Sequence, residues 1–157
     1  MSCKLPVRWL VLVATTVAVL VSCGTQVGNL PDRVVGFLHS YDPENPQTYV
    51  DYFTPKIQES LSKFGSSTPG GLAMPGLPIG LQKAGKENLS KVTTGDLSFQ
   101  VRKSKGRQWA EVTVSYDSAA GRATEKLIWI RVDGQWYLFG KTAGEETEYG
   151  QPPYFVT

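Results

Sequence analysis

The sequence predicts an α+β domain in which N-terminal helices pack on a curved antiparallel sheet of four or more strands. Apolar residues recur at helical spacing between residues 31 and 64. From about residue 89 onward the apolar period changes to two, and short turns that contain glycine separate the alternating runs. Helices followed by an antiparallel meander are typical of the α+β class.

Residues 1–22 have the anatomy of a secretion signal. Lys4 and Arg8 precede an apolar run over residues 9–21 that is interrupted only by Thr15 and Thr16. A run of about thirteen residues falls short of the roughly 20 that a membrane-spanning helix needs. We therefore expect a removable signal and not a permanent transmembrane anchor.

The end of this run, Leu20-Val21-Ser22-Cys23, resembles the lipobox of bacterial lipoproteins. The resemblance implies that Cys23 becomes the first mature residue and carries lipid, palmitate included. Two or more acyl chains anchor a protein stably, whereas one does so only marginally. The protein is then expected outside the cytoplasm, anchored to the membrane through Cys23 and a tether over residues 23–30. Because Gly24 is not Asp, the destination would be the outer membrane in a Gram-negative cell; in a Gram-positive cell it would be the outer face of the cell membrane.

The charge of the mature chain is balanced. Lys4 and Arg8 belong to the signal, which leaves 14 basic against 14 acidic residues. A nucleic-acid partner is not expected, since phosphate binding needs a basic surplus on one face. The basic residues Arg102, Lys103, Lys105 and Arg107 do gather around Gly106, where we interpret them as a solvated hairpin tip.

The helical part is divided by its prolines. A first helix is predicted over residues 31–41, and the two prolines within residues 42–46 end it. Thr48 is expected to cap a short helix over residues 49–53. Thr54-Pro55 then starts a third helix, which ends near Gly65.

Residues 65–80 contain five glycines and three prolines, and no regular element is expected there. A loop of this length in a compact domain is either functional or disordered. Its apolar content favours a contact with a ligand, a partner or the membrane, with a plain loop as the alternative. The candidate contact residues are Leu72, Met74, Leu77 and Ile79.

Four strands are predicted from alternating runs around residues 97–101, 110–116, 127–132 and 136–139. The last two runs are richer in apolar residues, so we expect them to be central or covered on both faces. Asp133-Gly134 is the strongest hairpin signal, because a type I′ turn needs positive φ at both central positions. The domain is predicted over residues 31–142. The tail, residues 143–157, has three possible roles: a frayed end, an edge strand or an extended peptide for a partner.

The order of these elements, together with the run from Val132 to Phe139 (VDGQWYLF), resembles the nuclear transport factor 2-like or cystatin-like superfamily. The resemblance implies a cone-shaped sheet with an open apolar mouth. Members use this mouth as an active site, a ligand pocket or a partner surface, so the fold does not decide the function.

Catalytic chemistry is sparse in this chain. His39 is the only histidine, and Asp42 follows three positions later, which would place both on one helical face. A His39–Asp42 dyad of a dehydratase or isomerase is one interpretation; a helix-end histidine without a catalytic role is the other. Apart from Cys3 in the signal and Cys23 at the lipobox there is no thiol. Neither a metal nor a cofactor is expected.

These observations favour a non-catalytic, lipid-anchored protein of the cell envelope that binds a partner protein or a small apolar ligand. Two alternatives stay open. One is an enzyme that uses His39 and Asp42 within the cone. The other is a structural tethering module whose cone is filled by its own side chains.

Overall fold

A computed structural model of the chain describes residues 27–64 and 76–156. The predicted signal, Cys23 and most of the 65–80 segment lie outside this part. The elements are three longer N-terminal helices with three short 3₁₀ turns among them, four strands and a C-terminal helix: α2 (Leu30–Ser40), η1 (Pro46–Thr48), η2 (Val50–Tyr52), α3 (Pro55–Phe64), α4 (Ile79–Leu89), η3 (Thr94–Asp96), β1 (Leu97–Ser104), β2 (Arg107–Ser118), β3 (Gly121–Val132), β4 (Gln135–Leu138) and α5 (Ala143–Tyr149).

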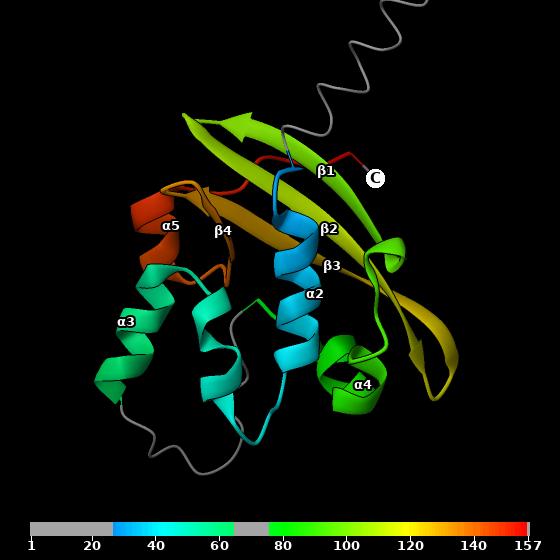
Figure 1. Cartoon of the computed structure of the whole chain (residues 1–157). Helices are drawn as coiled ribbons and strands as arrows, with labels where there is room; N and C mark the ends of the chain where they lie inside the picture. The colour runs from blue at the N-terminus through cyan, green and yellow to red at the C-terminus, as the bar shows by residue number, and fades with distance from the viewer. Residues whose placement is uncertain (1–26, 65–75, 157) are drawn as a thin grey trace, which may run out of the picture.

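The strands form one open antiparallel sheet in the order β1-β2-β3-β4, so that each strand pairs with the next along the chain. The long β2–β3 hairpin curls around the helices, and α2 and α4 lie on the inner face of the curve (Figure 1). The predicted α+β class and the antiparallel meander are confirmed.

Two hairpins close through tight turns with positive φ at both central residues. Asp133 and Gly134 have φ of 48° and 83° between β3 and β4. Lys105 and Gly106 have φ of 50° and 77° between β1 and β2. This pattern matches the right-handed twist of the flanking strands, so the hairpin prediction at Asp133-Gly134 is correct.

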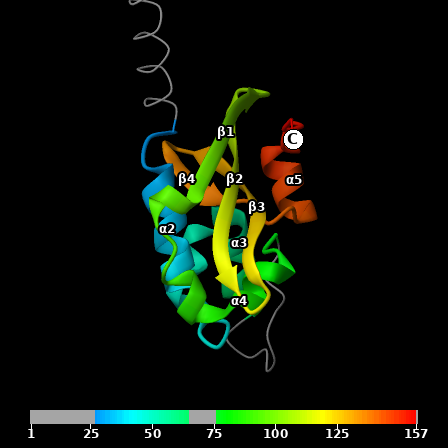
Figure 2. The same ribbon diagram turned by 90° about the vertical axis from the view of Figure 1, so that its right-hand side faces the viewer.

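The sheet separates two hydrophobic cores. The larger core lies under α2, the 3₁₀ turns and α4, and the smaller one lies under α5 and the C-terminal segment. Figure 2 shows α2 and α5 on opposite sides of the sheet. Leu127 and Trp129 point into the first core, and Ile128 and Ile130 into the second. The unbroken apolar run of β3 is therefore explained by cover on both faces.

The helices differ from prediction at two places. Thr48 does not cap a helix over residues 49–53; its hydroxyl donates to the Ser40 carbonyl at 2.6 Å, and that segment forms the 3₁₀ turn η2. The helix α4 was not predicted. Its glycines hid the pattern, and Gly85, with φ 75° and ψ 162°, interrupts the helical backbone.

The C-terminal segment folds with the domain. Thr142 and Glu145 form a reciprocal capping box that starts α5. Tyr149 and Phe155 are buried in the second core, against Trp109 and Phe139. Of the three roles left open for the tail, a frayed end does not describe residues 143–156, and no strand forms among them.

Candidate functional site

His39 and Asp42 are held by different partners. His39 is the next-to-last residue of α2; its side chain is exposed, and Nε2 donates to the Val92 carbonyl oxygen at 2.8 Å. Asp42 Oδ2 accepts from Lys86 Nζ of α4 at 3.1 Å, and Oδ1 accepts from the Glu44 backbone. The hydrogen bond from Lys86 is the first cause that lowers the Asp42 pKa. The end of α2 thus positions the two groups for tertiary contacts and not as a hydrogen-bonded dyad.

Two buried tyrosines lie beside this helix end. The rings of Tyr41 and Tyr49 are 5.0 Å apart between centroids. Burial, then the charges of Tyr41 and Asp42, raises the pKa of Tyr49 to about 12. Burial and Asp42 raise the pKa of Tyr41 as well. Both phenols are therefore protonated at neutral pH, and neither is poised to act as a base.

Aromatic rings occupy the concave side of the sheet. Phe37 of α2 is the centre of this group, with five rings whose centroids lie 5.9 to 6.3 Å away: Tyr41, Tyr49, Tyr52, Phe53 and Trp129. Edge-to-face geometry dominates, as expected for a packed aromatic core. Trp129 Nε1 is buried, and no acceptor within the described residues bonds to it. This packed, buried group lies on the side where the resemblance implied an open apolar mouth.

The four predicted contact residues differ in position and burial. Leu72 and Met74 lie outside the described residues. Leu77 was expected at the surface, but its apolar side chain is buried in the first core, and its carbonyl accepts from Gln82 Nε2 of α4. Ile79 is 68% exposed, as expected, although it is the first residue of α4 and not part of an irregular loop.

Two further apolar side chains are exposed in the C-terminal segment. Tyr154 is 80% and Val156 is 56% exposed, on either side of the buried Phe155. The Val156 carbonyl accepts from Gln100 Nε2 of β1 at 2.8 Å, which holds this segment against the sheet. With Ile79 they are the large apolar residues exposed in the described part of the chain.

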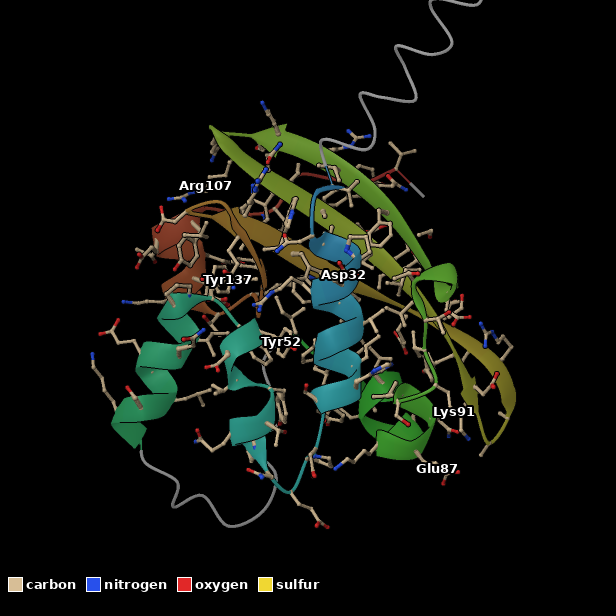
Figure 3. The ribbon with its side chains drawn as sticks, in the orientation of Figure 1. Asp32, Tyr52, Glu87, Lys91, Arg107 and Tyr137 are labelled. Atoms are coloured by element: carbon tan, nitrogen blue, oxygen red, sulfur yellow. The ribbon has the colours of Figure 1, made fainter. Side chains whose placement is uncertain are left out.

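A clamp around Arg33 is a feature that sequence reasoning missed. Its guanidinium lies 4.5 Å from the centre of the Tyr52 ring and 5.6 Å from that of Tyr137, and it donates to the carbonyls of Trp136 and Asp51. Figure 3 shows the two tyrosines, which come from η2 and β4. The residues are far apart in sequence, so no local pattern could have revealed the group.

One buried charged side chain, Glu145, accepts several hydrogen bonds. Its Oε1 accepts from the Thr54 hydroxyl at 2.5 Å and from the Gly140 backbone at 3.2 Å. Its Oε2 accepts from the backbone and the hydroxyl of Thr142, each at 3.1 Å. A carboxylate with this many donors is saturated by the fold and has no lone pair directed to a ligand.

Within residues 27–64 and 76–156, no three histidine, cysteine or acidic side chains gather as metal ligands would. The helices of this part are all too short or too polar to cross a membrane. Comparison of the chain with protein-family models, with curated proteins and with solved structures gives no match.

Proposed function

We propose that this chain is a lipid-anchored protein of the bacterial cell envelope whose domain binds a partner protein without catalysis. The observation that carries the proposal is the lipobox-like Leu20-Val21-Ser22-Cys23 at the end of a short apolar run. Lipid on Cys23 would place the domain outside the cytoplasm, at the outer membrane of a Gram-negative host or on the outer face of a Gram-positive cell membrane.

Two features of the domain support binding over catalysis. The groups that an enzyme of dehydratase or isomerase type would use, His39 and Asp42, are engaged by Val92 and Lys86. On the concave face, where such an enzyme would bind its substrate, aromatic rings pack around Phe37. A small apolar ligand would have to displace these rings, so we favour a partner at the surface. A purely structural tether would also have a filled cone.

The anchor is tested with the two cysteines as a matched pair. We expect the wild type and Cys3→Ala to incorporate labelled palmitate and to partition into the detergent phase. Cys23→Ala is expected to do neither, because it lacks the sulfur that is acylated. Membrane association of Cys23→Ala equal to that of the wild type would contradict the anchor.

The partner is tested in intact cells with a photoreactive amino acid at the exposed apolar positions Ile79 and Tyr154. Ser90, which is exposed and polar, is the matched control position. We expect a discrete crosslinked product from Ile79 or Tyr154 and none from Ser90. No product from either apolar position would count against a partner at these surfaces and in favour of the structural tether.

A further inference from the structure

Basic side chains gather at one end of the domain. The β1–β2 hairpin contributes four of them and β3 and α2 one each; we call these six residues the basic end: Arg33, Arg102, Lys103, Lys105, Arg107 and Arg131. Figure 3 shows Arg107 at the hairpin, whereas Glu87 of α4 and Lys91, just after α4, lie at the opposite end of the molecule. The domain is neutral as a whole, so this is a separation of charge and not a general surplus.

The cations of the basic end lack carboxylate partners. Among the described residues, none of the six forms a salt bridge, whereas six of the eight other basic side chains do: Lys56, Lys63, Lys86, Lys91, Arg122 and Lys126. Arg107 donates to the backbone carbonyl of Glu148, and Arg131 to Gln108 and to the Gly134 carbonyl. These contacts orient the guanidinium groups but do not neutralise them.

Acidic residues are not absent from this end. Asp133 lies in the β3–β4 turn, and Asp32 lies in the first turn of α2, where Figure 3 labels it. Neither forms a salt bridge within the described residues. Two more acidic residues border the basic end, because the backbone carbonyls of Asp51 and Glu148 accept from Arg33 and Arg107; the Glu148 carboxylate itself pairs with Lys56. Six cations against these four carboxylates still leave a positive surface.

The described chain begins beside this surface. Trp136 Nε1 donates to the Val27 carbonyl at 3.0 Å, and Trp136 pairs with Arg131 across β3 and β4. Arg131 pairs in turn with Gln108, and Gln108 with Lys103. Neighbouring strands are about 5 Å apart, so the three steps across the sheet from Trp136 to Lys103 cover about 15 Å. Figures 1 and 2 both show α2 starting at the end that holds the hairpin tip.

We propose that the basic end faces the membrane and binds the headgroups of anionic lipids, which holds the anchored domain in one orientation. The inference rests on the lipid at Cys23 proposed above. Three residues lie between Cys23 and Val27, and the four steps of a fully extended chain span at most about 14 Å. A tether this short lets the basic end reach the headgroups, whose field persists over a Debye length of about 8 to 10 Å.

The chemistry of the surface fits lipid phosphate. Arginine binds phosphate through two parallel N–H donors, and lysine adds point charge. Basic residues next to a membrane anchor are attracted by anionic lipids in a way that salt weakens. Arg102, Lys103 and Lys105 are exposed, so they can reach the headgroups without unfolding the hairpin.

The test uses full-length lipidated protein reconstituted into vesicles. A dye is attached at Ser104→Cys near the hairpin tip or at Ala119→Cys in the β2–β3 turn, and energy transfer to a headgroup acceptor is measured. The two labels lie at opposite ends of β2, Arg107–Ser118, which is about 36 Å long at 3.3 Å per residue. Labelling is selective because Cys3 is lost with the signal and the Cys23 sulfur carries the lipid.

On phosphatidylcholine vesicles that contain phosphatidylglycerol, we expect transfer from position 104 to exceed that from position 119 roughly threefold. Without phosphatidylglycerol, or in about 1 M salt, the ratio of energy transfer from position 104 to that from position 119 is expected to fall at least twofold. The combined variant Arg102→Gln, Lys103→Gln and Lys105→Gln is expected to show the same fall. The charge-matched control Lys63→Gln, Lys83→Gln and Lys91→Gln is expected to keep the wild-type ratio.

A ratio that does not respond to anionic lipid would overturn the orientation proposal, and an acidic protein partner would then be the better explanation of the basic end. An equal fall in both triple variants would overturn it too, because net charge alone would be responsible. Flotation with neutral vesicles reports the anchor separately. If the protein fails to float, the anchor and this inference both fail; if it floats without a preferred end, only this inference fails.

Discussion

The hydroxyl of Thr54 donates a 2.5 Å hydrogen bond to the buried carboxylate of Glu145, which lies 91 residues later in the chain. Thr54 precedes α3, and its hydroxyl also accepts from the Ile57 backbone. Glu145 is part of the capping box of α5. One contact therefore links the start of an N-terminal helix to the start of the C-terminal helix.

Replacing Thr54 with Val is expected to destabilise the domain by about 1–3 kcal/mol, because the Glu145 carboxylate loses a donor that water cannot replace. Urea unfolding measures the change. The control is Thr147→Val, since the exposed Thr147 hydroxyl donates only to the Ala143 carbonyl of its own helix. That variant is expected to stay within about 0.5 kcal/mol of wild type. An equal loss of unfolding free energy in the two variants would show that the Thr54–Glu145 hydrogen bond contributes no more to stability than the exposed one of Thr147.

Gly76 is expected to tolerate no side chain. Its φ is 75°, and an added Cβ would lie 2.6 Å from Gly140 Cα and 2.7 Å from the Phe139 carbonyl oxygen. Because both obstacles are backbone, we expect Gly76→Ala to cost about 2–4 kcal/mol from strain and overlap. Gly144→Ala is the control: its Cβ would meet only the Lys56 side chain, at 3.5 Å from Cε and 3.7 Å from Cγ, and the change should stabilise α5 by about 0.5–1 kcal/mol. Thermal unfolding distinguishes the two variants. An unchanged unfolding temperature for Gly76→Ala would contradict the close approach of Gly76 to the Phe139–Gly140 backbone.

Alkaline stability is expected to depend on Tyr49. Burial is the first cause that raises its pKa to about 12, whereas an unfolded tyrosine ionises near 10. A raised folded pKa means that stability is constant below about pH 10 and decreases as pH rises through about 12. Tyr49→Phe should make stability decrease less steeply with pH, because this ionising group is removed. Tyr154→Phe, at an exposed position, should leave the decrease unchanged. Urea midpoints from pH 8 to 11 check the prediction; identical slopes in the two variants would contradict it.

Among the side chains that follow α5, Phe155 is expected to contribute most to stability. Phe155 is buried against the second core, whereas its neighbour Tyr154 is 80% exposed. We expect Phe155→Ala to cost about 3 kcal/mol, near the low end for a core aromatic because it is close to the chain end. Tyr154→Ala should change the free energy of unfolding by less than about 0.5 kcal/mol. Similar effects at the two positions would mean that the segment does not pack as described.

Local periodicity was sufficient for the sheet. The unbroken apolar run of β3 predicted cover on both faces, and the two cores that it separates confirm this. Asp133-Gly134 predicted its own turn because the residue types match the backbone angles. Local periodicity was not sufficient to predict α4, where Gly80 and Gly85 weakened the helical pattern. The neighbours of Gly80 are also tertiary: an added Cβ would meet the ends of the Glu125 and Tyr116 side chains.

The sequence by itself determined the α+β class, the neutral charge of the mature chain and the expectation of a lipid at Cys23, since each depends on composition or on residues close together. Only the tertiary structure decided that His39 and Asp42 bond to Val92 and Lys86 and that Leu77 is buried. It also decided that the cations of the hairpin lie at the same end of the sheet as Trp136, to which Val27 is bonded. Hydrogen bonds, ion pairs and charged surfaces join residues that are distant along the chain, and a local pattern carries no information about which of them will meet.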